Sequence, residues 1–139
     1  MRKVYSRIMC LAGTIFLAVL FACSDDEYDR DPGPTDIRIR NLSTKIYDSI
    51  EVNTSGGINM YGIVNPDAES NYKRFDEAYP KADISVYIDG VEYTYGPVDY
   101  TYAVWLGKGK FSYEVWITDT INHVLDMRVG DDIYPLDDL

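Results

Sequence analysis

The sequence has few of the residues that most often carry catalysis or bind metals. Its 139 residues include one histidine and two cysteines. These are too few to make a His/Cys metal site or a nucleophile of the Cys/His type an obvious candidate. Basic residues are also few, with 13 Lys+Arg against 23 Asp+Glu and a net charge of −10. That balance argues against a nucleic-acid-binding protein, because phosphate contacts need a basic patch. A hydrophobic content of 46% nevertheless excludes a wholly disordered chain, and the length suits one domain.

The long apolar run lies at the start of the chain. Residues 1–22 hold three basic residues and no acidic one, and apolar residues fill most of the stretch from Ile8 to Ala22. This stretch is shorter than the roughly 20 residues that a membrane-spanning helix needs. It therefore predicts a secretory signal peptide over 1–22, with an uncleaved membrane anchor as the alternative.

The junction after this run carries a more specific motif. Leu20-Phe21-Ala22-Cys23 resembles the bacterial lipobox, although Phe21 is bulkier than the usual alanine or serine. In lipoproteins of that kind the cysteine receives a diacylglycerol and becomes the new N-terminus. The resemblance implies lipidation of Cys23 and a membrane as a partner through that lipid. Cys10 would leave with the signal, so no intramolecular disulfide could form.

An acidic segment follows the cysteine. Without residues 1–22 the chain has 10 Lys+Arg against 23 Asp+Glu, a net charge of −13. Ser24, Asp25, Asp26 and Glu27 resemble the export signal of Bacteroidota lipoproteins, which implies the outer membrane, facing the cell exterior. A merely polar tether is the alternative. Residues 23–34, which end in a stiffening Pro-Gly-Pro, are expected to be the tether, and the acidic residues 131–139 a partly ordered tail.

Residues 35–130 show strand patterns almost throughout. Ile84, Val86 and Ile88 alternate with polar residues before Asp89-Gly90, a dipeptide that favours a two-residue hairpin turn because both positions adopt positive φ. A two-residue loop predicts that Ile88, Val86 and Ile84 pair with Val91, Tyr93 and Tyr95. Tyr93, Tyr95 and Tyr113 are expected to face inward. A second hairpin is predicted around Gly107–Gly109, and Asp67–Ala78 is the only weak helix candidate.

Seven to eight short strands with this spacing predict an all-β fold, either an antiparallel sandwich or a small barrel. Their number and the long middle connection favour the antiparallel immunoglobulin-like β-sandwich. Asn53–Gly57, Met60-Tyr61-Gly62, Tyr72–Phe75 and Pro97–Tyr100 look like segments of the small uncharacterised outer-membrane lipoproteins of gut Bacteroidota. That resemblance covers most of the mature chain and implies a fold and a location. It brings no catalytic residue with it.

Catalytic patterns are weak. His123 is alone, no Gly-x-Ser-x-Gly elbow is present, and the adjacent acids are better explained as solvated charge. We therefore expect no enzyme, no catalytic residue, no metal site and no cofactor. Binding of Ca²⁺ by Asp-rich loops, or a small carboxylate-based hydrolase, stays open as an alternative.

The aromatic residues are the remaining lead on binding. Tyrosine combines a flat face with a hydroxyl, which suits stacking on sugars or sealing a protein interface. Five aromatic residues are expected on the surface or in the connection before the last strands, where they could contact a ligand: Tyr87, Tyr100, Tyr102, Trp105 and Trp116. The alternative is that Trp116 is covered or caps an edge strand.

Two short motifs match the O-glycosylation acceptor pattern of Bacteroidota proteins, at Ser49 and Thr120. Taken together, the sequence predicts a lipid-anchored surface module that binds a glycan or an envelope protein, and no nucleic acid.

Overall fold

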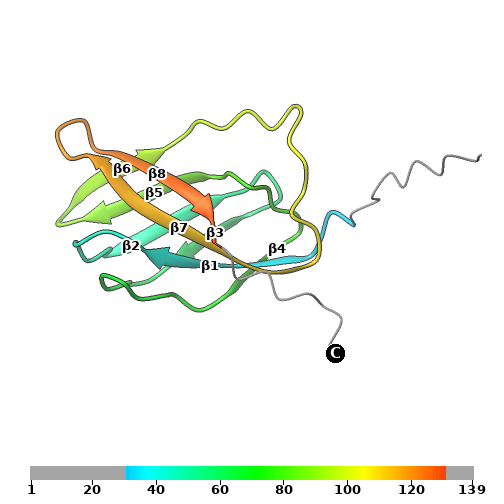
Figure 1. The fold of residues 1–139 in the computed structure, drawn as a ribbon, viewed down its shortest axis with the longest axis horizontal. Helices are drawn as coiled ribbons and strands as arrows, with labels where there is room; N and C mark the ends of the chain where they lie inside the picture. The colour runs from blue at the N-terminus through cyan, green and yellow to red at the C-terminus, as the bar shows by residue number, and fades with distance from the viewer. Residues whose placement is uncertain (1–30, 131–139) are drawn as a thin grey trace, which may run out of the picture.

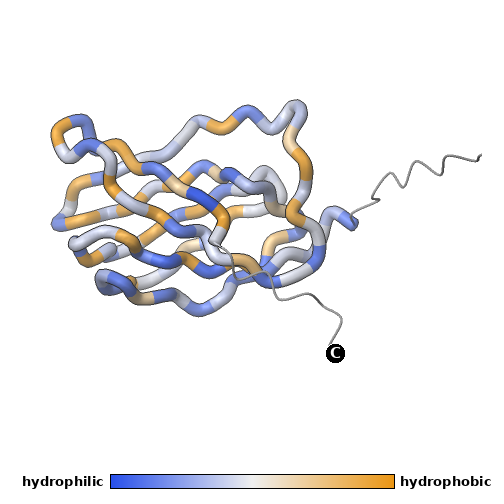
Figure 2. Tube along the Cα trace, viewed as in Figure 1, coloured by the Kyte–Doolittle hydropathy of each residue, from blue (hydrophilic) through white to orange (hydrophobic). Residues whose placement is uncertain are grey.

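The computed structural model describes residues 31–130, and these form strands and no helix. The strands are, in chain order, β1 (Thr35–Asn41), β2 (Ser49–Asn53), β3 (Ile58–Tyr61), β4 (Lys73–Phe75), β5 (Asp83–Ile88), β6 (Val91–Tyr95), β7 (Gly109–Asp119) and β8 (Val124–Val129). Hydrophobic and hydrophilic residues alternate along them (Figure 2), as expected for strands with one face on a core. The predicted all-β class is confirmed.

The eight strands belong to one mixed sheet with the order β3-β2-β5-β6-β8-β7-β1-β4. The sheet curls around the core, so that β1, β7 and β8 lie in front of β2, β3 and β5 in Figure 1. Its two edge strands meet at a seam. Asn59 Nδ2 donates a hydrogen bond to the carbonyl of Arg74 at 2.8 Å, and the amide of Asp76 donates to the carbonyl of Gly56 at 3.1 Å. The sheet is therefore nearly closed as a barrel.

The pairing differs from the predicted antiparallel arrangement at two places. β1 pairs with β7 in parallel over its whole length, from Thr35–Gly109 to Asn41–Val115. β6 and β8 also run parallel and pair at Thr94 and Val124. The expectation of purely antiparallel strands is wrong because an alternating strand looks the same whichever way its neighbour runs.

The segment before β7 differs as well. No hairpin forms at Gly107–Gly109, since residues 96–108 cross irregularly from β6 to β7. The carbonyl of Gly107 instead accepts a hydrogen bond from the Thr35 hydroxyl at 2.8 Å, which ties this connection to the start of β1. The segment 67–78 contains β4 and no helix.

The core fills the inside of the curled sheet. Tyr113 is fully buried, and Tyr93 and Tyr95 pack against the core while partly buried, as predicted. The fully buried larger side chains include Tyr47, Phe75, Ile37, Ile39, Ile50, Ile84 and Leu125. This interior is mainly apolar, and the two hollows described below lie at the surface.

The predicted signal peptide, Cys23 and the residues 24–27 lie outside the described residues, as does the tail 131–139. Between residues 31 and 130, no helix has the length and apolar character needed to cross a membrane.

Candidate functional site

The five predicted contact aromatics lie in three separate places. Tyr87 is exposed on the outer face of β5, Trp116 is half-buried on β7, and the other three belong to the connection 96–108. They do not form one continuous strip. The alternation that placed Tyr87 and Trp116 on outer faces was right, but it could not show that β5 and β7 lie on opposite sides of the core.

Trp105 and Tyr100 are held by polar contacts inside the protein. Trp105 Nε1 donates to Glu77 Oε2 and to the Tyr79 hydroxyl, both at 3.0 Å. The Tyr79 ring lies 4.9 Å from the Tyr100 ring, and the Tyr100 hydroxyl donates to the carbonyl of Asn53 at 3.0 Å. Burial raises the pKa of Tyr100 to about 12, so its hydroxyl stays a donor at neutral pH. These contacts fasten the 96–108 connection to the barrel.

Tyr102 differs from these two neighbours. It is 95% exposed, and it lies between them in the sequence without sharing their contacts. Sequence reasoning missed Glu77 and Tyr79, the partners of Trp105. No local pattern announces them, because they come from a segment 26 to 28 residues earlier.

Trp116 lines a surface hollow of about 550 Å³ near the end of β7. The turn after β1 supplies the opposite wall through Leu42, Ser43, Thr44 and Lys45. The guanidinium of Arg128 stands 5.9 Å from the centre of the Trp116 ring. An aromatic side chain beside hydroxyls and a lysine can contact both the apolar face and the polar groups of a ligand.

A second and larger groove, of about 740 Å³, opens between β6 and β8. These strands pair at one residue each and then diverge, because the chain leaves β6 through Gly96-Pro97 and proline cannot donate to a sheet. Polar side chains in the groove come from Lys81, Thr94, Asp99, Thr118 and Asp126. Thr118 lines both hollows, so they adjoin at the end of β7. The sequence could not reveal this groove, since it depends on which distant strands become neighbours.

Asp99, one of the two carboxylates of this groove, is poorly suited to act as a general acid. Asp99 accepts hydrogen bonds from the amide and the hydroxyl of Thr101 at 2.9 and 2.5 Å. These bonds hold the pKa of Asp99 below its usual range, whereas a general acid needs a raised pKa. His123 lies in the turn before β8 with its ring 4.9 Å from that of Tyr93. No group of three His, Cys, Asp or Glu in the described part of the chain could hold a metal ion.

The two predicted glycosylation residues differ in accessibility. Thr120 is exposed in the turn between β7 and β8, where Asp119 Oδ1 accepts hydrogen bonds from the amides of Ile121 and Asn122. Ser49 is half-buried at the start of β2. A modifying enzyme could therefore reach Thr120 more easily than Ser49.

No family model and no curated protein matches the chain. A protein from Eubacterium rectale, whose structure was determined by NMR, is similar in fold: it aligns with a TM-score of 0.51 and 14% sequence identity over 78% of this chain and 96% of its own. At that identity the likeness concerns the fold alone.

Proposed function

We propose that this chain is a lipid-anchored binding module of the bacterial cell surface, whose ligand occupies the two adjoining hollows at the end of β7. The ligand would be a glycan or a segment of an envelope protein. Aromatic and hydroxyl side chains recognise both, since one ring face binds apolar surface while nearby polar groups fix orientation. This proposal rests most on the placement of Trp116 in a hollow beside Thr118.

The tryptophans would have different roles in this module. Trp105 donates its N–H to Glu77 and Tyr79 and therefore supports the fold. Trp116 lines the hollow, and the centre of its ring lies 5.9 Å from the guanidinium of Arg128. Trp116 is therefore the better ligand contact of the two.

The anchor is part of the proposal and rests on the lipobox. Palmitate labelling of the protein and of a Cys23→Ala variant in a lipoprotein-processing host tests it. We expect labelling of the parent only, and labelling that persists in the variant would refute lipidation at Cys23.

An immunoglobulin-like sandwich also belongs to the proposal. The halves β3-β2-β5-β6 and β8-β7-β1-β4 are joined on one side by the single pair Thr94–Val124 and on the other by the few hydrogen bonds of the seam between β3 and β4. These weak joints support a description as two packed layers.

A screen of the full chain against a panel of polysaccharides and envelope proteins tests binding. We expect Trp116→Ala to weaken any binding at least tenfold, an effect of about 1.4 kcal/mol, while Tyr87→Ala on the opposite side leaves it unchanged. Binding to nothing in the panel, or binding that is insensitive to Trp116→Ala, would contradict the proposed site. Binding of Ca²⁺ or hydrolysis of a glycan that depends on Asp99 and Asp126 would favour the alternative function.

A further inference from the structure

Positive charge is unevenly distributed over the barrel. Strands β2, β3, β5 and β6 contain no lysine or arginine, although they carry Glu51, Asp83 and Glu92. Strands β1, β4, β7 and β8 contain six of the basic residues. Five of these share the outward side of the sheet by register, and we name this side the arginine face: Arg38, Arg40, Arg74, Lys110 and Arg128.

Two acidic residues of the arginine face, Glu114 and Asp36, lie beneath its cations, whereas Glu69 is 33% exposed beside Arg38, which is 18% exposed, and Asp126 is half-buried opposite Trp116. Glu114 is 8% exposed and accepts hydrogen bonds from Arg40 Nη1 at 3.2 Å and Arg128 Nε at 2.6 Å, while these two side chains are 41% and 66% exposed. Asp36 is 18% exposed under Arg74, which is 68% exposed. At Arg40, Arg74 and Arg128 the outer groups are therefore cationic, even though the paired charges nearly cancel.

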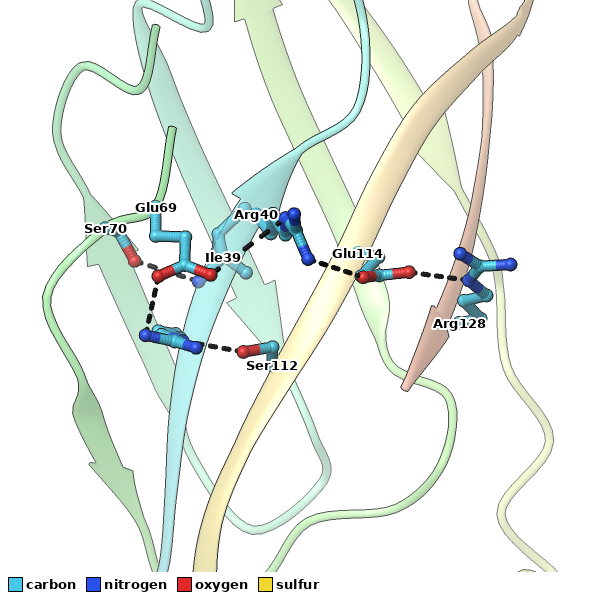
Figure 3. A network of polar contacts seen from close by, with 8 residues as sticks. Ile39, Arg40, Glu69, Ser70, Ser112, Glu114 and Arg128 are labelled. Atoms are coloured by element: carbon cyan, nitrogen blue, oxygen red, sulfur yellow. Dashed lines mark hydrogen bonds and ion pairs between the residues drawn. The ribbon is translucent and has the colours of Figure 1, made fainter. Parts of the chain in front are cut away.

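These ion pairs also orient the arginines. A guanidinium has five N–H donors, and Arg128 uses its Nε toward Glu114. Figure 3 shows Glu114 between Arg40 and Arg128, with the outer nitrogens of Arg128 directed away from Glu114. A planar guanidinium fixed from below is well suited to bind a carboxylate with two parallel hydrogen bonds.

Aromatic rings mark both ends of the face. Trp116 lies one row beyond Glu114 and Arg128, and the Tyr72 ring lies 5.1 Å from Arg38 and 5.3 Å from Lys110 Nζ at the other end. Along β7, Lys110 and Trp116 are about 20 Å apart at the usual rise of a strand. The face is thus an elongated surface with cations along its length and an aromatic ring at each end.

We propose that the arginine face binds an acidic polysaccharide, a chain of sugars that carry carboxylates such as uronic acids. The proposal rests on the binding function proposed above and names the class of its ligand. Uronate carboxylates would pair with Arg128, Arg74 and Lys110, while a sugar ring packs on Trp116. At physiological salt, charges are screened over about 8 Å. A polysaccharide on the arginine face would therefore be attracted by the cations beside it, with little repulsion from the acidic residues on the far side of the barrel.

The test is calorimetric binding of the full chain to polygalacturonate, with neutral dextran as the comparison polymer. We expect binding to polygalacturonate that weakens with added salt, and little binding to dextran. Arg74→Gln combined with Arg128→Gln should weaken it at least tenfold. Lys73→Gln combined with Lys108→Gln removes the same charge at positions outside the arginine face and outside both hollows, and it should change binding less than about twofold.

Each other outcome overturns the inference. Equal weakening by the two double variants would mean nonspecific attraction, and preference for polyglutamate would mean an acidic protein segment. Should the arginine variants unfold in a thermal melt, Lys110→Gln replaces them. The ammonium of Lys110 lies 5.3 Å from the centre of the Tyr72 ring and acts on Asp36 through its charge, so its loss should disturb the fold less than the loss of a hydrogen-bonded arginine ion pair. Binding of a neutral glycan that depends on Trp116 alone would keep the proposed function and remove this inference, whereas binding of no glycan would remove both.

Discussion

At the scale of single residues, the least expected feature is a buried asparagine. Asn41 continues the inward side of β1, after Ile37 and Ile39, and is fully buried. Its Nδ2 donates to the carbonyls of Lys45 and Val64 at 2.7 and 2.9 Å, and its Oδ1 accepts from the amide and hydroxyl of Ser43 at 2.8 Å each. Because a buried polar group is costly unless paired, Asn41 fixes the turn after β1.

Replacing this asparagine should destabilise the fold strongly. Asn41→Ala leaves the amide of Ser43 without its partner and removes one of the hydrogen bonds to each of the carbonyls of Lys45 and Val64. We expect a loss of about 2–4 kcal/mol in the free energy of unfolding. Urea denaturation followed by circular dichroism measures it. Asn71→Ala, at an exposed position, should cost less than about 0.5 kcal/mol. Equal costs would show that water replaces the bonds of Asn41.

At the scale of elements, the β5–β6 hairpin is the best-predicted part of the fold. Its register is the predicted one, with Ile84, Val86 and Ile88 opposite Tyr95, Tyr93 and Val91. Asp89 and Gly90 have φ values of 51° and 79°, as the turn type demands. Turn and alternation agree there because both are local properties.

Replacing Gly90 should destabilise the protein because of the backbone conformation at this position, and not because a side chain would lack room. No atom lies within 4 Å of a Cβ added at Gly90 or at Gly62, but only Gly90 has a positive φ. We expect Gly90→Ala to cost about 1 kcal/mol, and Gly62→Ala to be neutral or slightly stabilising. Urea midpoints of the two variants compare them directly, and equal midpoints would contradict the explanation.

The 96–108 connection shows where sequence reasoning ends. The sequence predicts its tyrosines and tryptophan as ligand contacts. The hydrogen bonds of Trp105 and Tyr100 to Glu77, Tyr79 and Asn53 could not be predicted, because these partners come close only after folding. The parallel partner of β1 and the hollows beside Thr118 are equally nonlocal. The strands could be predicted from alternation, whereas their neighbours, and therefore the candidate site, could not.

The anchoring of this connection gives its own prediction. Trp105→Phe keeps an aromatic side chain, although a smaller one, and removes the N–H bonded to Glu77 and Tyr79. We therefore expect a loss of about 1–2 kcal/mol in the free energy of unfolding and faster proteolysis within residues 96–108. Tyr102→Phe, at a 95% exposed position, serves as the control and should leave both measurements unchanged. If proteolysis does not respond, the connection is held by other contacts.

At the scale of the whole molecule, acidic side chains join strands that are distant in the sequence. Asp36 on β1 accepts bonds from Arg74 on β4 at 2.8 and 3.1 Å, which fixes the last strand of the sheet order. Glu114 links β7 to β1 and β8 through Arg40 and Arg128. In a chain of net charge −10, pairs of this kind reduce repulsion among the carboxylates and make stability depend on pH.

The Asp36–Arg74 pair sets the direction of that dependence. Its hydrogen bond and the charge of Arg74 hold the pKa of Asp36 below its ordinary 3.8. A lowered pKa in the folded state stabilises the fold above about pH 4, and this contribution is lost as the pH falls below that value. Asp36→Asn should therefore be less stable than the parent at pH 7, by up to about 1 kcal/mol for so exposed an arginine, and the difference should shrink toward pH 3. Urea denaturation at pH 7, 5 and 3 measures it, with Glu92→Gln on the opposite face as the control. A difference that stays constant down to pH 3 would mean that Asp36 contributes through shape and not through charge.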